Sequence, residues 1–404
     1  MLLRSYATIW DFVNHVFGTS IPSMPPNSFG TFVALGFLAG GIVLYKDLKR
    51  RSELGIFPGT PSEQITGAKA TYQDLLMPGI IGFIAGFKLV WIFLNWDEFS
   101  TNAQDFLLSS DGNLVAGLFV GGLAAGWRYY SINKKALPES LVKKVTVYPY
   151  DQIGDMVLIA AIAGVLGSNV FNWLSSKDDS ITEFFKDPVG SMFSGLTIYG
   201  GLIFGSAGMI WYASKKRINA WHLFDVLGMS FMLAYGIGRI GCHVSGDGDW
   251  GISNLAAKPG FIPQFLWSSQ YPHNVLGEGP IPITGMEMIP DCTGKYCQQL
   301  IEPVFPTPLY ELAMCTILFA ILWSVRKKFT PYPGLLVGLF LIFNGAERFL
   351  IEKIRVNDKL EFMGLNWTQA EYIAVGMALI GAGIMYYSYK QGKQEYNPPK
   401  AKQN

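Results

Sequence analysis

Charged residues are scarce in this chain. Only 15% of its 404 residues are charged, compared with about 25% in ordinary soluble domains, and the net charge is +1 at pH 7. A chain without a basic excess lacks the electrostatic footprint of a nucleic-acid-binding protein, so no nucleic-acid partner is expected. Half of the residues are hydrophobic, and glycine (45) and tryptophan (11) are abundant, as in helices that pack closely in lipid. The composition predicts an all-α polytopic membrane protein.

Cysteine is also scarce, with four residues in the chain. Cys292 and Cys297 lie in a long polar loop, and their spacing suits a small disulfide if that loop faces an oxidising compartment. Two free thiols are an equally good interpretation. The segment from Leu2 to Phe17 lacks the continuous apolar core of a cleavable signal peptide. We expect it to form an amphipathic helix at the membrane interface, within an extracytoplasmic segment 1–26.

Long apolar segments recur along the chain, and roughly 20 apolar residues suffice to cross a bilayer. We predict nine spans, which lie near residues 29–45, 76–96, 113–130, 154–174, 196–213, 222–241, 307–325, 334–351 and 369–388. The first six belong to a membrane domain over 27–251, in which the second and third form an extra hairpin near 72–135. The last three belong to a membrane domain over 306–388. Between these domains, segment 252–305 has no helical period. We therefore expect it to form a small extracytoplasmic head.

Basic residues follow every odd-numbered span, whereas the loop after the second span is acidic. The basic clusters are Lys46 to Arg51, Arg128 to Lys144, Lys215 to Arg217, Arg326 to Lys328 and Lys390 to Lys402. Cytoplasmic loops of membrane proteins carry an excess of lysine and arginine. We therefore expect an N-terminus outside the cell and a cytoplasmic C-terminal tail over 389–404. The segments that follow Arg239 and Arg348 then emerge on the outer side.

A weak internal repeat leaves a second class of function open. Tyr72 and Tyr150 recur at an offset of 78 residues, as do Ala85-Gly86 and Ala163-Gly164. Repeats of membrane hairpins are common in transporters, although small-residue matches in membrane helices also arise by chance. A membrane carrier therefore stands as an alternative to an enzyme.

Two groups of arginines mark a candidate site. Arg239 stands where the apolar segment 222–238 gives way to a glycine-rich loop that ends at Gly251. Arg348, Glu352 and Arg355 are spaced so that they share one helical face. Ionisable residues at the edge of a span are costly and indicate function. Guanidinium forks match phosphate oxygens bidentately, so the pattern predicts a site for a phospholipid headgroup.

The acidic residues near these arginines have several possible roles. We expect Glu352 to orient an arginine rather than to accept a proton, because a carboxylate beside a guanidinium stays ionised. Arg355 could bind phosphate or pair with Asp358. Asp247 and Asp249 resemble part of a calcium loop, but a turn held by their side chains is the better interpretation, and no metal is expected.

Two residues open the helix after the head. Tyr310 is a candidate for substrate binding, and Glu311 could serve only to complement the helix dipole.

The segments that carry these residues resemble prolipoprotein diacylglyceryl transferases. Gly238-Arg239-Ile240-Gly241 and Trp250-Gly251 are similar to the ends of that family's signature, with Asp247 where the family has glutamate. Three more blocks match in the same order. They are Tyr199-Gly200-Gly201-Leu202-Ile203, Pro306 to Glu311, and Arg348 to Arg355. Asn27-Ser28-Phe29-Gly30 stands where the family has an aromatic-Tyr-Gly sequence.

The resemblance implies a fold and a reaction. The family has seven spans in the same orientation, so the extra hairpin would account for nine. Its enzymes act in the bacterial cytoplasmic membrane. They move the diacylglyceryl group of phosphatidylglycerol to the lipobox cysteine thiol of a prolipoprotein, without a cofactor. Arg239 and Arg348 would then stabilise the departing phosphate. The substrate, together with membrane lipids, would contact the residues Gly200, Gly201, Asp247, Tyr310, Glu352 and Arg355.

The chain departs from the family where a proton is transferred. The family's histidine before Gly-Gly-Leu-Ile is Tyr199 here, and two asparagines of the signature are Cys242 and Ser245. His243 follows Arg239 by four residues, so a continued helix would place both on one face. We therefore predict that His243 acts as the base and that Tyr199 orients lipid or phosphate. Alternatively, His243 is only a hydrogen-bonded loop residue. For the protein as a whole, a paralogue that binds lipid without transferring it is a further alternative.

The orientation can be tested by labelling single cysteines introduced into loops. Because the basic clusters lie on alternate loops, we expect a membrane-impermeant reagent to label segment 243–305 in intact cells. Segment 214–221 should react only after permeabilisation. Labelling of both segments from the same side would contradict the orientation and the placement of the site.

Overall fold

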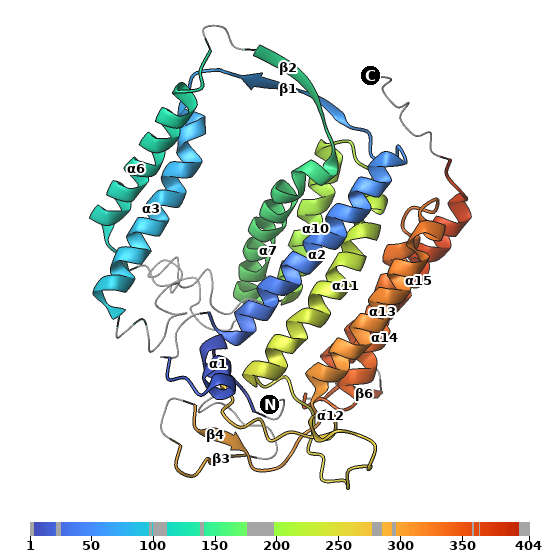
Figure 1. Ribbon diagram of the computed structural model, residues 1–404. Coiled ribbons are helices and arrows are strands. Elements are labelled where there is room, and N and C mark those ends of the chain that lie inside the picture. Colours follow the sequence, from blue (N-terminus) through green and yellow to red (C-terminus); the bar gives the residue numbers. More distant parts are fainter. Residues whose placement is uncertain are drawn as a thin grey trace. The chain divides into compact units, whose positions relative to one another are not determined.

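Helices dominate this computed structural model, which describes residues 4–21, 26–96, 99, 111–137, 141–175, 198–276, 285–292, 296–357, 359–362 and 364–395. Each predicted span coincides with a described helix of at least 18 residues (Figure 1). These helices are α2 (Ser28–Glu53), α3 (Tyr72–Leu94), α6 (Leu114–Asn133), α7 (Ile153–Ser175), α10 (Ile198–Lys215), α11 (Ala220–Ser245), α13 (Thr307–Phe329), α14 (Leu335–Glu352) and α15 (Gln369–Gln391).

Among the described residues, six helices are long and apolar enough to cross a membrane by length and composition. They are α2, α3, α7 with the preceding 3-10 turn, α11, α13 and α15. Helix α14 is comparably long but carries Glu347, Arg348 and Glu352 near its end. The protein is therefore a polytopic membrane protein, and nine crossings remain a prediction.

The N-terminal helix is shorter than the sequence predicts. Helix α1 (Ile9–Phe17) begins after Thr8, whose hydroxyl accepts a hydrogen bond from Asp11 N while the Asp11 carboxylate accepts one from Thr8 N. Residues 4–8 are not helical. Ser5 N donates to Pro272 O and Tyr6 N donates to Val244 O, at 2.8 and 2.6 Å. The helix predicted from Leu2 was wrong in its start, because these backbone groups bond to distant segments instead.

The chain divides into two compact units, residues 1–56 with 219–404 and residues 57–218. In the first unit, α11 packs against α2, α13 and α14, and α15 packs on α14. Met229, Met232, Leu322 and Leu336 are fully buried between these helices. A Cβ atom at Gly36 would lie 2.7 Å from Ala234 O, so a glycine is required where α2 crosses α11.

The second unit contains two helical hairpins, α3 with α6 and α7 with α10. Strands β1 (Thr60–Thr66) and β2 (Leu141–Val147) flank the first hairpin and pair antiparallel, from Thr60↔Val147 to Thr66↔Leu141. The extra hairpin is therefore closed by its own ribbon. The 3-10 turn η1 (Pro149–Gln152) precedes α7, and Tyr212 Oη in α10 donates to Gln152 Oε1 at 2.9 Å.

The predicted head contains a short helix, α12 (Gln264–Trp267), and a ribbon of β3 (Met286–Met288) and β4 (Gln298–Leu300). Trp250, Tyr271, Leu300 and Val304 form its apolar core. Cys292 and Cys297 form a disulfide, which decides between the two interpretations of these cysteines. A last ribbon, β5 (Lys359–Phe362) with β6 (Leu365–Thr368), connects α14 to α15.

A buried ionic cluster lies where α11 begins. Asp225 is fully buried and accepts hydrogen bonds from Val337 N at 2.9 Å and Gly334 N at 3.2 Å, at the start of α14. Arg51 of α2 reaches Asp225 at 3.5 Å and Asp47 at 2.9 Å. The Arg51 guanidinium also lies 2.7 Å from His222 Nδ1. Because buried charges need partners, this cluster fixes α2, α11 and α14 relative to one another.

Replacing Asp225 with alanine should destabilise the protein by about 3–5 kcal/mol, because it removes one partner of a buried ion pair. The α14 N–H groups would lose their acceptor as well. Thermal and denaturant unfolding in detergent measures the change, with Glu63→Ala on exposed β1 as the control. If the free energy of unfolding falls by less than about 1 kcal/mol, the cluster contributes no more to stability than a surface ion pair does.

Candidate functional site

Arg239 lies in the last two turns of α11, and it has three kinds of partner. Its Nε lies 2.9 Å from Glu311 Oε2, and its Nη2 donates to Tyr235 Oη at 2.8 Å. Its Nη1 pairs with Asp249. The guanidinium also lies 4.8 Å from the centre of the Tyr235 ring. These contacts hold the guanidinium in one orientation at the end of the helix.

Glu311 is the acceptor that the arginines share. It lies in the first turns of α13, and its side chain is fully buried. Arg355 Nη1 and Arg348 Nη1 lie 3.5 and 3.7 Å from Glu311 Oε1, and Arg239 contacts the other oxygen. The expectation that Glu311 only complements the helix dipole was wrong. The carboxylate joins three arginines that come from α11, α14 and the segment after α14.

Arg348 and Glu352 form the pair that their spacing predicts. Arg348 Nη2 lies 3.0 Å from Glu352 Oε2, one helical turn away. Asn357 Nδ2 donates to the other oxygen of Glu352. The ion pair is confirmed, and the role of Glu352 in orienting Arg348 remains a prediction. The Arg348 side chain is 26% exposed, the most of the three arginines.

Asp249 joins the loop after α11 to the same cluster. Its two carboxylate oxygens pair with Arg239 and with Arg355. Arg355 thus pairs with Asp249, while Asp358 lies outside the described residues. Thr307 Oγ1 donates to Asp249 O at 2.6 Å, which fixes the loop to the start of α13. Asp247 Oδ1 accepts from Asp249 N at 3.2 Å, so the turn held by an aspartate side chain is present.

The pKa values of Asp247 and Asp249 shift in opposite directions, although the two residues are close in sequence. Burial raises the pKa of Asp247, and the Asp249 carboxylate raises it further. Burial would also raise the pKa of Asp249, but Arg239 and Arg355 outweigh it and lower that pKa. The stabilisation from Asp249 is therefore present above its unfolded pKa, near 4, and is lost as the pH falls through the lower folded value.

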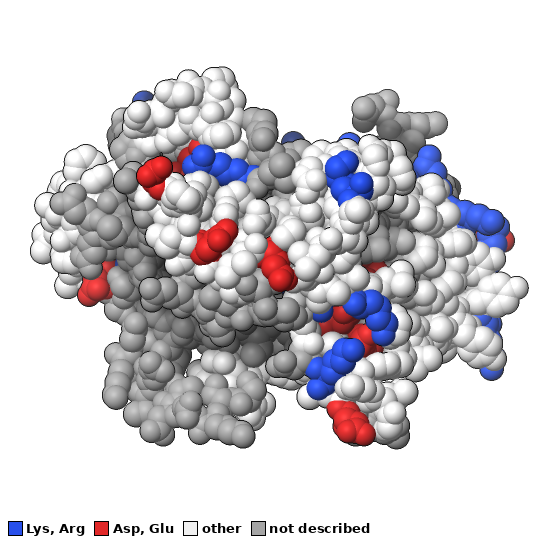
Figure 2. All heavy atoms as spheres, turned by 90° about the horizontal axis from the view of Figure 1, so that it is seen from below, with Lys and Arg blue, Asp and Glu red and all other residues white. Residues whose placement is uncertain are grey.

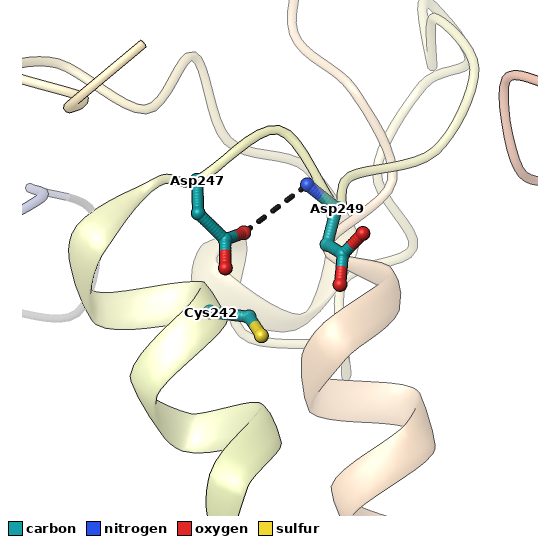
Figure 3. Close-up of side chains that lie close together, drawn as sticks. All are labelled: Cys242, Asp247 and Asp249. Carbon is teal, nitrogen blue, oxygen red and sulfur yellow. Dashed lines mark hydrogen bonds between the residues drawn. The ribbon is translucent and has the colours of Figure 1, made fainter. Parts of the chain in front are cut away.

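Cys242, Asp247 and Asp249 have ligand atoms within 4.8 Å of one another (Figure 3). Such a group could hold a metal ion. Here both oxygens of Asp249 are paired with guanidinium groups, whose positive charge opposes a cation at the same place. The Cys242 thiol shares a hydrogen bond with Asp247. The arrangement therefore fits arginine binding better than metal binding.

Gly251 allows the loop to approach two other segments. It forms an isolated antiparallel bridge with Arg355, and its N–H donates to Phe305 O at 2.9 Å. A Cβ atom at this position would lie 2.5 Å from Ile354 O and 2.9 Å from Thr307 Cγ2. Backbone atoms cannot yield as a flexible side chain can, so the close contact requires glycine. This contact positions Asp249 between α13 and Arg355.

Two predicted site residues have other contacts. His243 is 5% exposed, and its Nδ1 lies 3.0 Å from Tyr271 Oη. This contact ties the end of α11 to the core of the head. Tyr310 Oη donates to Leu266 O at 2.7 Å and so anchors the loop that contains α12. The catalytic role of His243 and the substrate contact of Tyr310 remain predictions.

The predicted residues of α10 lie in the other unit. A Cβ atom at Gly200 would lie 2.2 Å from Gly167 O, and one at Gly201 would lie 2.8 Å from Ser168 Oγ. Both glycines thus allow α10 to pack closely on α7. The Tyr199 side chain lies outside the described part of the structure, so its role remains a prediction.

Sequence reasoning assigned no site role to Tyr235 and undervalued Asp249 and Glu311. Tyr235 precedes Arg239 by four residues on α11, which was the available signal for their contact. Asp249 lies 106 residues from Arg355, and Glu311 lies 72 residues from Arg239 and 44 from Arg355, so no local spacing reveals these pairs.

The site contains matched charges rather than a purely basic surface. Arg239, Arg348 and Arg355 face Asp249, Glu311 and Glu352. Figure 2 shows basic and acidic side chains close together on the face seen from below. Because carboxylates hold each guanidinium in place, the arginines need little reorganisation to meet an anion.

Gly251→Ala should reduce activity strongly while the helices remain folded, because the added methyl group displaces Asp249 from Arg239 and Arg355. The measurement compares enzymatic turnover and helix content with those of Gly260→Ala. A Cβ atom at Gly260 meets nothing within 4 Å, which makes it a matched control. Equal activity of the two variants would show that the position of the loop is unimportant.

Comparisons with known proteins show which family the chain resembles. A family model described as prolipoprotein diacylglyceryl transferase matches residues 136–387. Two similar relatives are the phosphatidylglycerol–prolipoprotein diacylglyceryl transferases of Streptococcus pneumoniae strains Hungary19A-6 and ATCC 700669 / Spain 23F-1. Each is 28% identical over 250 residues, which cover 60% of this chain and 80% of the relative. The match of the family model includes α11, α13 and α14 with all three arginines, and the chain belongs to the prolipoprotein diacylglyceryl transferase family.

Proposed function

We propose that this protein transfers the diacylglyceryl group of phosphatidylglycerol to the lipobox cysteine thiol of prolipoproteins. The reaction forms a thioether and releases glycerol phosphate. The observation that carries the proposal is the convergence of Arg239, Arg348 and Arg355 on the buried carboxylate of Glu311. Membership of the family supports it.

The arginine cluster suits the charge that develops in this reaction. When the thiol sulfur attacks the glyceryl carbon, the carbon–oxygen bond to phosphate breaks and negative charge grows on the phosphate oxygens. Fixed donors in a partly dry site stabilise that charge without reorganising. Arg239 and Arg348 are the proposed phosphate-binding pair, because a guanidinium fork can donate to two phosphate oxygens at once. Arg355, Glu352 and Asp249 then hold the pair in place.

The site lies at the helix ends opposite the basic clusters. Helix α11 begins shortly after Lys215 to Arg217 and reaches Arg239 near its end, whereas α13 begins beside Glu311 and ends with Arg326 to Lys328. The positive-inside rule places the basic ends in the cytoplasm. We therefore propose that the site faces the outer side of a bacterial cytoplasmic membrane. Phosphatidylglycerol and exported prolipoproteins would meet there.

A membrane carrier is the rival function, with a lipid-binding paralogue that transfers nothing as a third. Carriers bind their cargo near the middle of the membrane, between repeated halves. In this protein the three arginines gather at one end of α11, α13 and α14. That placement favours chemistry at the membrane surface over passage through it.

Arg239→Ala should cost roughly 3 kcal/mol or more of transition-state stabilisation, because it removes a preorganised donor to the phosphate. Arg348→Ala should have a similar effect. Arg239→Lys should recover little activity, since an ammonium group cannot reproduce the fork. The assay uses purified protein in phosphatidylglycerol vesicles with a lipobox peptide, and it measures the thioether product. Arg128→Ala, at an exposed position of α6, is the control.

Complementation provides the matching test in cells. Expression in a strain depleted of its own transferase should restore growth, and mass analysis of a lipoprotein's N-terminal peptide should show the diacylglyceryl modification. Normal turnover by correctly inserted Arg239→Ala protein would refute the role of the arginine. Binding or movement of lipid by the wild-type protein without any thioether would favour the carrier or the paralogue.

A further inference from the structure

Glu347 is a buried carboxyl group that the site described so far does not use. It lies in α14, one residue before Arg348, and it is 2% exposed. Within the described structure, neither of its carboxyl oxygens has a hydrogen-bond partner. Buried polar groups are nearly always hydrogen-bonded, so an exception calls for an explanation.

The other acidic residues of the cluster are held by positive charge. Glu311 and Glu352 lie in ion pairs with arginines, whereas Glu347 forms no ion pair with any residue that the structure describes. An ionised carboxylate without a donor costs several kcal/mol in an apolar interior. A neutral carboxyl group, which keeps its proton, avoids this cost. An ionisable residue inside a span is a functional candidate, because it is costly to keep there.

Glu347 interacts electrostatically with the arginine cluster. The charged and titratable groups around it are Tyr235 and Arg239 of α11, Glu311 and Cys315 of α13, Arg348 of α14, and Arg355. Its carboxyl group is thus within electrostatic range of the donors that we assign to the phosphate.

The proposed reaction requires a proton to move from sulfur to phosphate. The thiol loses its proton when the carbon–sulfur bond forms, and the departing glycerol phosphate gains negative charge. The family's histidine is Tyr199 in this chain, and His243 contacts Tyr271 in the head core. The arginines cannot serve, because they do not release their protons in proteins.

We propose that Glu347 carries this proton, an inference that rests on the proposed function. The neutral carboxyl group gives its proton to the phosphate oxygen as the carbon–oxygen bond breaks. The resulting carboxylate, now beside Arg239 and Arg348, takes the proton of the attacking thiol. One carbon–sulfur bond forms, one carbon–oxygen bond breaks, and Glu347 returns to its neutral form. No external acid, base or oxidant is consumed.

Glu347→Gln tests the proposal, because glutamine keeps the size of the side chain but cannot transfer the proton. We expect kcat to fall by about 100-fold or more, the usual range for a lost acid–base group. KM for phosphatidylglycerol should change by less than about threefold, since the arginines still bind the phosphate. The full-length protein is assayed in phosphatidylglycerol vesicles with a lipobox peptide. Rates are measured in H2O and D2O.

Three comparisons make the test specific. Glu347→Asp should recover part of the activity, and a solvent isotope effect seen in the wild type should be absent from Glu347→Gln. Glu287→Gln, which alters an exposed carboxylate of β3, should behave as the wild type. His243→Ala should keep more activity than Glu347→Gln. If His243→Ala instead loses most of its activity at neutral pH and recovers it at high pH, the histidine is the base.

The outcomes separate the two levels of the proposal. An active wild-type protein with an equally active Glu347→Gln variant would overturn the role of Glu347 and leave the transferase assignment intact. The role of Glu347 would be supported if Glu347→Asp is folded and active and if Glu347→Gln no longer shows the solvent isotope effect. A wild-type protein that forms no thioether in vesicles or in cells would overturn both.

Discussion

A carboxylate buried at the end of a membrane helix is stable only when it is paired with a positively charged side chain. Glu311 meets Arg239, Arg348 and Arg355, which come from three different segments. The ends of α11, α13 and α14 are therefore held together by one side chain. The loop that carries Asp249 is fixed to the same place, because Asp249 joins two of these arginines.

Helix α11 is held by buried charge at both of its ends. At one end Asp225 bonds to Arg51 and to the first N–H groups of α14. At the other end Arg239 forms ion pairs with Glu311 and Asp249. Between them the helix packs through small residues, as at Gly36 against Ala234. Charges fixed in this way form a preorganised site, since they cannot turn toward or away from a ligand freely.

The acidic residues of the site divide into two kinds. Asp249, Glu311 and Glu352 have arginine partners and act as supports. Glu347 lies among the same groups without a hydrogen bond from the described residues. Neighbouring carboxyl groups in different environments can differ in how readily they ionise, and they can then have different chemical roles. The resemblance to the family would not have drawn attention to Glu347, because it lies outside the motif residues that match.

Several features of the protein follow from local sequence alone. Each predicted span is a helix in the structure, because roughly 20 apolar residues and flanking charges are local properties of the chain. The pairing of Arg348 with Glu352 follows from helical spacing. The turn at Asp247 follows from the short side chain of aspartate. Recognition of the family also came from residues in sequence, and the family model confirms it.

Tertiary structure decided what those residues do together. Glu311 and Arg355 are 44 residues apart in sequence, and Asp225 and Arg51 are 174 apart. His243 contacts Tyr271, which lies in the head. The start of α1 was misplaced because its preceding backbone bonds to Val244 and Pro272. Sequence patterns record which side chains face the interior, but the partner of a buried charge depends on which helices meet there.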